Sequence, residues 1–469
     1  MLDIRLDAAA SGALPIYRQL LDQIEFLIRS GKLSCGERLP STRDLSRQLG
    51  ISRGAVVQAY EELCSRNICA SRVGRGTEVL AVSDAVTSAL NRALDATAGT
   101  LLAFDEPIID DPRVRSLMPS IADTTHLPVT ELRQGFNKVL RYPALLNAFG
   151  ESAGDLTLRK LICEKLLPAR GIIAKPEEVL VVPGSQYGAV LIAMTLQKSC
   201  NAIHFGVPGY IDIPRNFARF NYTLHAHGVD SNGILLGDTR LGPEDLLYLM
   251  PQHHFPQCLT LDNARRATIL EQSEKRGAMI MEDDYDSEFY YDHQPQAALK
   301  ASNAGRNVIY FGTFSKVLFN TVRLAYVVAD AGLIREMAGL HWSLSRGTNG
   351  LVQRWVAELL ASGVIERHVQ RMRSVYRRRR DKLAGLLGTM FPDWDFQKPE
   401  GGLQFFVKIG SDIELRRVLA ACQKANLAVG IPSVYTLPEV PSCPFIVIGF
   451  GAMQFSQIKS ALVDLRRML

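Results

Sequence analysis

The sequence has few features that would place the protein in a membrane or in an oxidising compartment. It has no run of about 18 apolar residues. Its first residues, Met1 to Arg5, mix acidic, basic and apolar side chains, unlike the basic segment that begins a secretory signal. The eight cysteines form neither a C-x-x-C pair nor a zinc-finger spacing. We therefore expect a cytoplasmic protein with reduced thiols, no membrane partner and no metal site.

A strong bias in charge is also missing. The 53 Lys and Arg residues exceed the 48 Asp and Glu residues by only five. A chain of 469 residues is too long for one ordinary hydrophobic core, so two or three domains are expected. The positive charge is concentrated locally, because residues 38–75 contain seven basic and three acidic side chains. Such a concentration is what binding to a phosphate backbone requires.

Three short helices are predicted within the first eighty residues. The first is expected between Pro15 and Gly31, since apolar residues recur there on one helical face: Ile16, Leu20, Ile24, Leu27 and Ile28. Ser41 is a suitable N-cap for the second helix, and Gly50 ends it. The third is predicted from Arg53 to about Asn67.

Residues 70–80 then predict two short strands around glycine. A helix pair joined by a tight turn and followed by a strand hairpin is typical of a winged helix-turn-helix. The second helix of the pair would enter the major groove of double-stranded DNA by its amino-terminal end, and the glycines would let the wing approach the sugar-phosphate surface. The predicted DNA-contacting residues are Arg43, Ser52, Arg53, Arg72 and Gly74. The alternative is a generic three-helix packing module.

Beyond this segment, apolar strand-like runs alternate with amphipathic helical stretches. The predicted strands are Val179–Val182, Ala202–Phe205, Leu259–Leu261, Ala278–Met281, Val308–Phe311 and Leu324–Val328. This alternation indicates an α/β domain with a parallel-rich central sheet, followed by a smaller carboxy-terminal α+β part. We predict a DNA-binding head at residues 13–81, a linker at 82–103 and an effector body at 104–469.

The body contains residues suited to a pyridoxal phosphate (PLP) site. Lys316, in a loop after a predicted strand, can form the internal aldimine. Asp283 can keep the pyridine nitrogen protonated, and Tyr285, two residues further on, can bind the 3-oxygen of the ring from the same side of an extended segment. Taken singly, each match can also be explained by a purely structural role; paired Asp residues, for example, often form turns.

The remaining parts of a PLP site also have candidates. The phosphate needs backbone donors at a helix start, and Gly184, Ser185 and Gln186 lie between a predicted strand and a predicted helix. Three further side chains can close around the phosphate: Thr313, Ser315 and Arg323. Tyr210 is the candidate for an aromatic plate against the ring. The complete set of candidate residues, in this order along the chain, is much less probable by chance than any single match.

These motifs resemble known families. Leu39–Leu45, Leu49–Arg53 and Arg72–Thr77 are similar to the DNA-binding head of GntR-type transcription regulators, and the body resembles the fold-type-I aminotransferases. Glu282–Phe289 and Gly312–Lys316 are similar to the MocR subgroup, in which the two parts are fused. The resemblance implies a head-to-tail homodimer that binds operator DNA and senses PLP or a PLP-reactive amine through Lys316.

The sequence departs from this pattern at several positions. Val447 stands where aminotransferases carry the arginine that binds the substrate α-carboxylate, and Phe149 stands where a tyrosine commonly reaches the PLP phosphate of the partner subunit. His254 and Cys258 stand where the resembled subgroup usually has a Gln and a Gly in the loop Pro-x-His-Gln-x-Pro-x-Gly. In the head, Gly54-Ala55 replaces the usual Asn-Thr. The loss at Val447 argues against efficient turnover of α-amino acids.

We therefore predict a PLP-dependent, DNA-binding transcription regulator rather than an enzyme. The alternative is a catalytically active aminotransferase that carries a DNA-binding head. A degenerate body that serves only as a dimer scaffold is disfavoured, because Asp283, Tyr285, Lys316 and Arg323 are all present. The basic run Arg377–Arg380 is interpreted as part of a solvated or interfacial helix rather than as a nucleic-acid site, since four consecutive residues spread around a helix.

Overall fold

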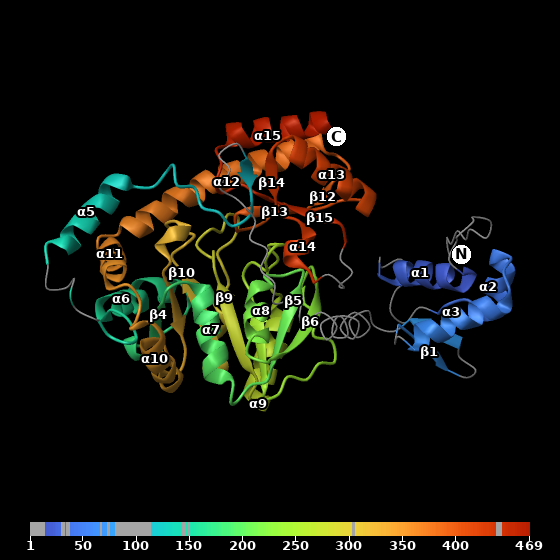
Figure 1. Cartoon of the computed structure of the whole chain (residues 1–469), viewed down its shortest axis with the longest axis horizontal. Helices are drawn as coiled ribbons and strands as arrows, with labels where there is room; N and C mark the ends of the chain where they lie inside the picture. The colour runs from blue at the N-terminus through green and yellow to red at the C-terminus, as the bar shows by residue number, and fades with distance from the viewer. Residues whose placement is uncertain are drawn as a thin grey trace. The chain divides into compact units, whose positions relative to one another are not determined.

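The structure is a computed structural model, and it describes residues 15–29, 33, 38–65, 68–72, 76–79, 114–142, 147, 150–302, 305–437 and 443–469. The chain divides into two compact units, an amino-terminal head and a larger body (Figure 1). The predicted linker at 82–103 lies outside the described residues, so its boundaries stay a prediction. No helix in the described ranges is long and apolar enough to cross a membrane.

The head consists of three helices and a strand pair. Its elements are α1 (Ile16–Arg29), α2 (Thr42–Leu49), α3 (Arg53–Ser65), β1 (Cys69–Arg72) and β2 (Gly76–Val79). The Ser41 side chain accepts a hydrogen bond from the Asp44 amide, and Gly50 ends α2 at a φ of 65°. β1 and β2 pair antiparallel, as a wing requires. The predicted winged helix-turn-helix is therefore present in the described part of the head.

An eight-stranded sheet forms the centre of the body. Its strand order is β4 (Val179–Val182), β11 (Ala325–Val328), β10 (Val308–Thr313), β9 (Met279–Asp284), β8 (Asp245–Leu249), β5 (Ala202–Val207), β6 (Thr223–Asp230) and β7 (Gly233–Ile234). The strands from β10 to β6 in this order pair in parallel, whereas β11 is antiparallel to both β10 and β4. Because β11 is antiparallel to both of its neighbours, β4 and β10 run in the same direction, and both end at the same edge of the sheet.

Helices cover the sheet. α7 (Ser185–Leu196) packs on β4, β10 and β11, and α8 (Asp212–Ala218) packs on β5 and β6 (Figure 1). Two further helices belong to this part of the body: α9 (Asn263–Arg276) and α10 (Ala331–Ser345). Most residues of the central strands are buried, which explains why these strands are continuous apolar runs in the sequence rather than alternating patterns.

One strand prediction was wrong. Leu259–Leu261 forms no strand, and Leu259 makes only an isolated bridge with His254. The position in the sheet between β5 and β9 is instead occupied by β8 (Asp245–Leu249), which the sequence analysis did not identify. Three residues, Leu-Thr-Leu, carry too little pattern to distinguish a strand from a buried loop.

The carboxy-terminal part of the body is a smaller α+β layer. Its elements are β12 (Asp395–Phe396), β13 (Gln404–Lys408), α13 (Asp412–Lys424), β14 (Leu427–Val429), α14 (Pro432–Tyr435), β15 (Phe445–Gly449) and α15 (Phe455–Met468). β12, β13 and β15 form an antiparallel sheet, and β14 pairs in parallel with β3 (Arg115–Leu117). Further α-helices among the described residues of the body are α5 (Val129–Leu140), α6 (Leu156–Leu161), α11 (Gly350–Ala361) and the long α12 (Val364–Met390).

The basic run on α12 has two environments. Arg377 and Arg378 are exposed, as expected for a solvated helix. Arg379 and Arg380 are buried: an Arg379 nitrogen lies 2.7 Å from Asp123, and an Arg380 nitrogen lies 2.6 Å from Asp292. The interpretation as a solvated or interfacial helix therefore does not describe these two side chains, because Asp123 and Asp292 reach them from distant segments of the chain.

Candidate PLP and DNA sites

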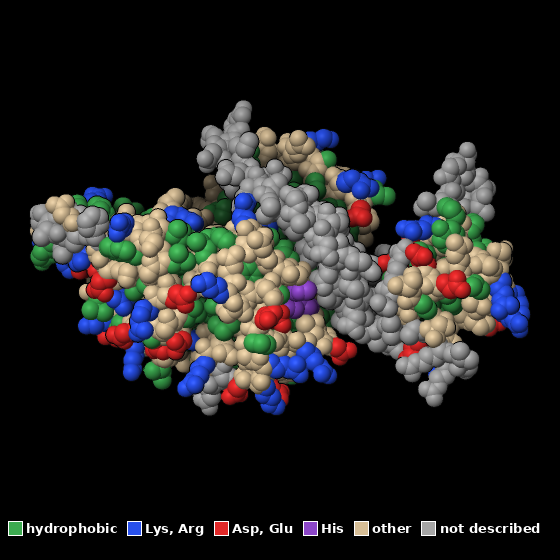
Figure 2. Space-filling view, turned by 60° about the horizontal axis from the view of Figure 1, so that its bottom comes forward, with side chains coloured by type: hydrophobic (Ala, Val, Ile, Leu, Met, Phe, Trp, Pro, Cys, Tyr) green, Lys and Arg blue, Asp and Glu red, His purple; other side chains and the backbone are tan. Residues whose placement is uncertain are grey.

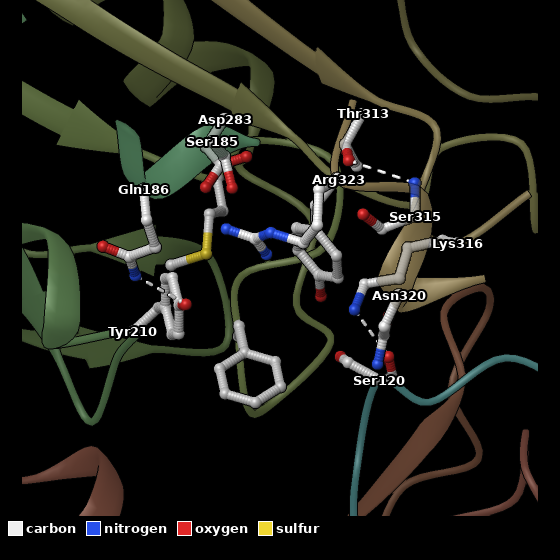
Figure 3. Close-up of a pocket in the computed structure, with 13 residues that line it drawn as sticks. Ser120, Ser185, Gln186, Tyr210, Asp283, Thr313, Ser315, Lys316, Asn320 and Arg323 are labelled. Carbon is white, nitrogen blue, oxygen red and sulfur yellow. Dashed lines mark hydrogen bonds between the residues drawn. The ribbon is translucent and has the colours of Figure 1, made fainter. Parts of the chain in front are cut away.

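A pocket of about 270 Å³ lies at the carboxyl edge of the parallel strands in the body (Figure 3). Ligands commonly bind at this edge in open α/β sheets. The pocket contains nine predicted residues: Ser185, Gln186, Tyr210, Asp283, Tyr285, Thr313, Ser315, Lys316 and Arg323. Four further lining residues were missed: Ser120, Met250, Phe255 and Asn320. The fold thus brings together side chains from five strand ends.

Asp283 lies near the end of β9 and is 7% exposed. The Tyr248 hydroxyl, on the neighbouring strand β8, donates a hydrogen bond of 2.9 Å to an Asp283 carboxylate oxygen. Burial raises the pKa of Asp283 to about 7, while the bond from Tyr248 opposes this change. A buried carboxylate with one fixed donor can pair with a protonated ring nitrogen.

Lys316 follows β10, and its Nζ donates a 2.6 Å hydrogen bond to the backbone carbonyl of Ser120. Burial lowers the pKa of the Lys316 ammonium, while Asp286 and Asp283 oppose this effect. A lowered pKa increases the fraction of neutral amine, which is the nucleophilic form. Lys316 is therefore suited to bond covalently to an aldehyde.

Other groups of the pocket are suited to an anion. Gly184, at the N-cap of α7, has a φ of 101°, and a Cβ at this position would lie 2.9 Å from Nη2 of Arg323. The absence of a side chain at Gly184 thus leaves room for the guanidinium beside the helix start. Ser185, Thr313 and Ser315 add hydroxyl groups to the same pocket. Helix-start amides, hydroxyls and one arginine are the donor set that a phosphate requires.

Aromatic side chains form one wall. Phe255 makes edge-to-face contacts with Tyr210, Tyr285 and Tyr435, with ring centroids 6.0, 6.1 and 5.2 Å apart. Gln186 donates a 2.7 Å hydrogen bond to the Tyr210 hydroxyl, so its side chain supports the ring rather than the phosphate end (Figure 3). The Tyr285 hydroxyl donates to the His253 carbonyl at 3.0 Å. Together with the amine, the buried acid and the anion-binding end, this wall fits PLP.

The structure shows the contacts of two residues that depart from the family pattern, Val447 and His254. Val447 is fully buried on β15, and a Cβ at Gly430 would lie 2.8 Å from both the Val447 Cβ and the Tyr435 hydroxyl. His254 Nε2 lies 2.9 Å from the Pro208 carbonyl oxygen, and because this oxygen only accepts, Nε2 is the donor. Burial lowers the pKa of His254 to about 4, which favours the neutral ring. Phe149 lies outside the described residues.

The candidate DNA-contacting residues of the head are exposed where they are described. Arg43 on α2, Ser52 and Arg53 all have exposed side chains, and Figure 2 shows arginine side chains (blue) gathered at one end of the head. The Ser52 hydroxyl accepts a 3.2 Å hydrogen bond from the Ala55 amide, so it caps α3. Arg72 belongs to β1, and Gly74 lies outside the described residues. The roles of these five residues stay predictions.

Replacing Tyr248 by phenylalanine should weaken PLP binding at neutral pH by about tenfold. The substitution removes the donor to Asp283, which raises the pKa of this carboxyl further and moves the pH range of tight PLP binding upward, because only the carboxylate pairs with a protonated ring nitrogen. Titrations of PLP affinity against pH test this expectation. Tyr222→Phe is a matched control, since its hydroxyl donates to the Ala193 carbonyl away from the pocket. Unchanged profiles in Tyr248→Phe would exclude the role of Tyr248.

Comparisons with known proteins cover both units. A family model described as bacterial regulatory proteins of the gntR family matches residues 16–79, which extend from α1 to β2. The pyridoxine biosynthesis transcriptional regulator PdxR of Corynebacterium glutamicum is 30% identical over 388 residues, covering 82% of this chain and 81% of the relative. The HTH-type transcriptional regulator TauR of Rhodobacter capsulatus is 30% identical over 400 residues, covering 80% of this chain and 80% of the relative.

A further relative is the probable rhizopine catabolism regulatory protein MocR of Rhizobium meliloti, 27% identical over 409 residues, covering 85% of this chain and 83% of the relative. Among solved structures, the kynurenine aminotransferase of Pyrococcus horikoshii superposes with a TM-score of 0.71 at 21% identity, over 79% of this chain and 95% of that chain. The α-aminoadipate aminotransferase LysN of Thermus thermophilus superposes with a TM-score of 0.69 at 21% identity, over 76% of this chain and 92% of that chain. The body thus has the aminotransferase fold.

Proposed function

Because the chain belongs to the MocR subgroup of GntR-type transcription regulators, we propose that it binds operator DNA with its head while its body senses PLP or a PLP-reactive amine. The observation that carries the proposal is the pocket that joins Lys316, Asp283, Tyr285 and Arg323 at one sheet edge. A transcription regulator that used its body only as a scaffold would have no need for this set of groups.

Within the pocket, each group has a distinct task. Arg323, the start of α7 and three hydroxyls would hold the phosphate, and Asp283 would hold the ring nitrogen. PLP, when bound, supplies an aldehyde that bonds to primary amines and an electron-withdrawing ring. Lys316 would hold this aldehyde, and its lowered pKa favours the amine that does so. A primary amine that reaches Lys316 would thus compete for the same position and change the occupancy of the lysine.

The effector would lack an α-carboxylate. Position 447 is a buried valine, which offers a carboxylate no charge and no hydrogen bond. An anion without a partner in a partly dry site costs several kcal/mol. PLP itself or an amine without this group is therefore the favoured signal.

A working aminotransferase with a DNA-binding head is the alternative function. The body has the fold of these enzymes, and its pocket retains the lysine and the acid that they need. Transfer of an amino group from common amino acids to a keto acid at about 1 per second or faster would favour the enzyme over the sensor.

We propose that the protein acts as a head-to-tail homodimer. Two-fold symmetry would place two heads on paired half-sites of the operator. Effector binding at the two pockets would then change the separation or orientation of the heads, and with it the affinity for a given half-site spacing.

The experiment that tests the proposal is operator binding with PLP titrated at fixed salt, using DNA from upstream of the protein's own gene. We expect PLP alone, or PLP followed by an amine, to change the affinity or the footprint by about fivefold or more, within the usual range of coupling between two sites. Pyridoxine 5'-phosphate, which keeps the phosphate but has an alcohol in place of the aldehyde, serves as the matched control ligand. If PLP binds but neither PLP nor any amine changes DNA binding, the sensor proposal is wrong.

A further inference from the structure

Ser120 and Asn320, which line the pocket together with Lys316, are polar and uncharged, and the charges that act on the lysine come from Asp286, Asp283 and Arg323. Ser120 accepts the hydrogen bond from Lys316 Nζ through its backbone carbonyl, at 2.6 Å. Asn320 lines the same pocket, and Figure 3 shows its side chain at the end occupied by Lys316 and Ser120. An amine that approaches Lys316 would therefore meet a hydroxyl, a carbonyl and an amide.

Ser120 is held in place by a chain of buried polar contacts. Its φ of 58° is unusual for a residue with a side chain. The Ser120 hydroxyl donates to Gln404 Oε1 at 3.3 Å, and Gln404 Nε2 donates to Cys258 Sγ at 3.0 Å. Gln404 is fully buried and Cys258 is 7% exposed. Cys258 thus helps to fix the residue that faces Lys316.

Asn320 is available to a ligand. Its side chain is exposed and makes no hydrogen bond with another described residue. A carboxamide has two donor hydrogens and an acceptor oxygen, so it can bind a hydroxyl group in either direction. An amide and a carbonyl together suit a neutral group that both donates and accepts.

The part of the pocket beside Lys316 and Ser120 has few groups that would stabilise a bound carboxylate. Among the described lining residues of the pocket, the cations are Lys316 and Arg323. Arg323 lies against Gly184 at the phosphate end, where a Cβ would approach its Nη2 to 2.9 Å. Val447 adds no charge from β15. A carboxylate bound beside Ser120 would also face the oxygen of a backbone carbonyl, which repels it.

We propose that Ser120 and Asn320 form the effector subsite, and that it recognises a primary amine bearing a hydroxyl group in place of the carboxylate of an amino acid. The chemical class is therefore the amino alcohols. This inference rests on the proposed function of the body as an amine sensor, and it adds the group by which the amine is selected.

The test compares serinol (2-amino-1,3-propanediol) with L-serine on the PLP-loaded, full-length protein. The two amines share a skeleton and differ in a hydroxymethyl group against a carboxylate. We measure the absorbance change of bound PLP and the shift in operator affinity against the concentration of each amine. Serinol is expected to act at a concentration about tenfold or more below that of serine. Equal potency, or a preference for serine, would overturn the inference.

Variants of Asn320 locate the selectivity. Asn320→Ala should weaken the response to serinol by about fivefold through loss of its hydrogen bonds, and Asn320→Arg should shift the preference toward serine by placing a cation beside Lys316. Asn263→Ala, an exposed asparagine at the start of α9, is the matched control and should leave the response unchanged. Variants that keep the PLP absorbance and the wild-type selectivity would overturn the role of Asn320.

The two proposals fail in different ways. If the wild-type protein shows no absorbance from bound PLP and its DNA binding ignores PLP, the proposed function is wrong and this inference falls with it. If PLP binds and an amine changes DNA binding, but serine and serinol act alike, only the subsite is wrong.

Discussion

Replacing Lys316 by alanine is expected to eliminate the absorbance of covalently bound PLP completely and to abolish any response of DNA binding to amines. The reason is that no other lysine lines the pocket among its described residues. Basal binding to operator DNA should remain measurable, because the exposed arginines of the head belong to a separate compact unit. Absorbance spectra and operator binding, measured on the same preparation, check both statements.

Two further variants sharpen this test. Lys316→Arg keeps a positive charge near Asp283 but provides no amine of comparable reactivity, so it should behave like the alanine variant in absorbance. Lys198→Ala, an exposed lysine after α7, should behave like the wild type. Loss of all DNA binding in a folded Lys316→Ala protein would mean that PLP has a structural role and is not the signal.

Replacing Arg53 by alanine should weaken binding to the operator by about 1–3 kcal/mol if its guanidinium contacts a base edge. Arg53 is the first residue of α3 and is exposed, and the helix start is the part that enters the major groove in this type of head. The affinity for unrelated DNA should change much less than the affinity for the operator, because base contacts carry the sequence information. Titrations of the protein with operator DNA and with unrelated DNA, at one salt concentration, give the ratio of the two affinities for each variant.

Arg43 provides the contrast to Arg53. If Arg43 on α2 contacts the phosphate backbone, Arg43→Ala should weaken binding to both DNAs by a similar factor and reduce the dependence on salt by about one ion. Arg276→Ala, on an exposed turn of α9 in the body, is the control and should leave both affinities unchanged. An operator affinity that is the same in Arg53→Ala and in the wild type would remove Arg53 from the DNA site.

Local features of the fold could be predicted from the sequence because their causes are local. Ser41 and Gly50 bound α2 as predicted, since a side-chain cap and a left-handed glycine act within one turn. The strand Val179–Val182 was predicted with its observed limits because it is a short, fully apolar run before Pro183 and Gly184. The order of Asp283, Tyr285, Lys316 and Arg323 likewise pointed to one pocket, and all four residues line it.

The parts that were missed depend on contacts between distant segments. Tyr248 reaches Asp283 only because β8 lies beside β9 in the sheet, and no periodicity in the sequence states this order. Arg379 is buried because Asp123, 256 residues away in the chain, meets it. A buried charge needs its partner, so the pattern around Arg379 alone predicted the wrong environment.

The sequence by itself determined the two-part organisation, the class of each part and most of the groups that would bind PLP, because capping, apolar runs and motif spacing act over a few residues. The tertiary structure alone decided what surrounds Lys316. Ser120 lies 196 residues from Lys316 in the chain, and Gln404 and Cys258 reach Ser120 from two other segments. Selectivity for one amine over another depends on these contacts between distant segments, because each residue acquires its role from the neighbours that folding brings next to it.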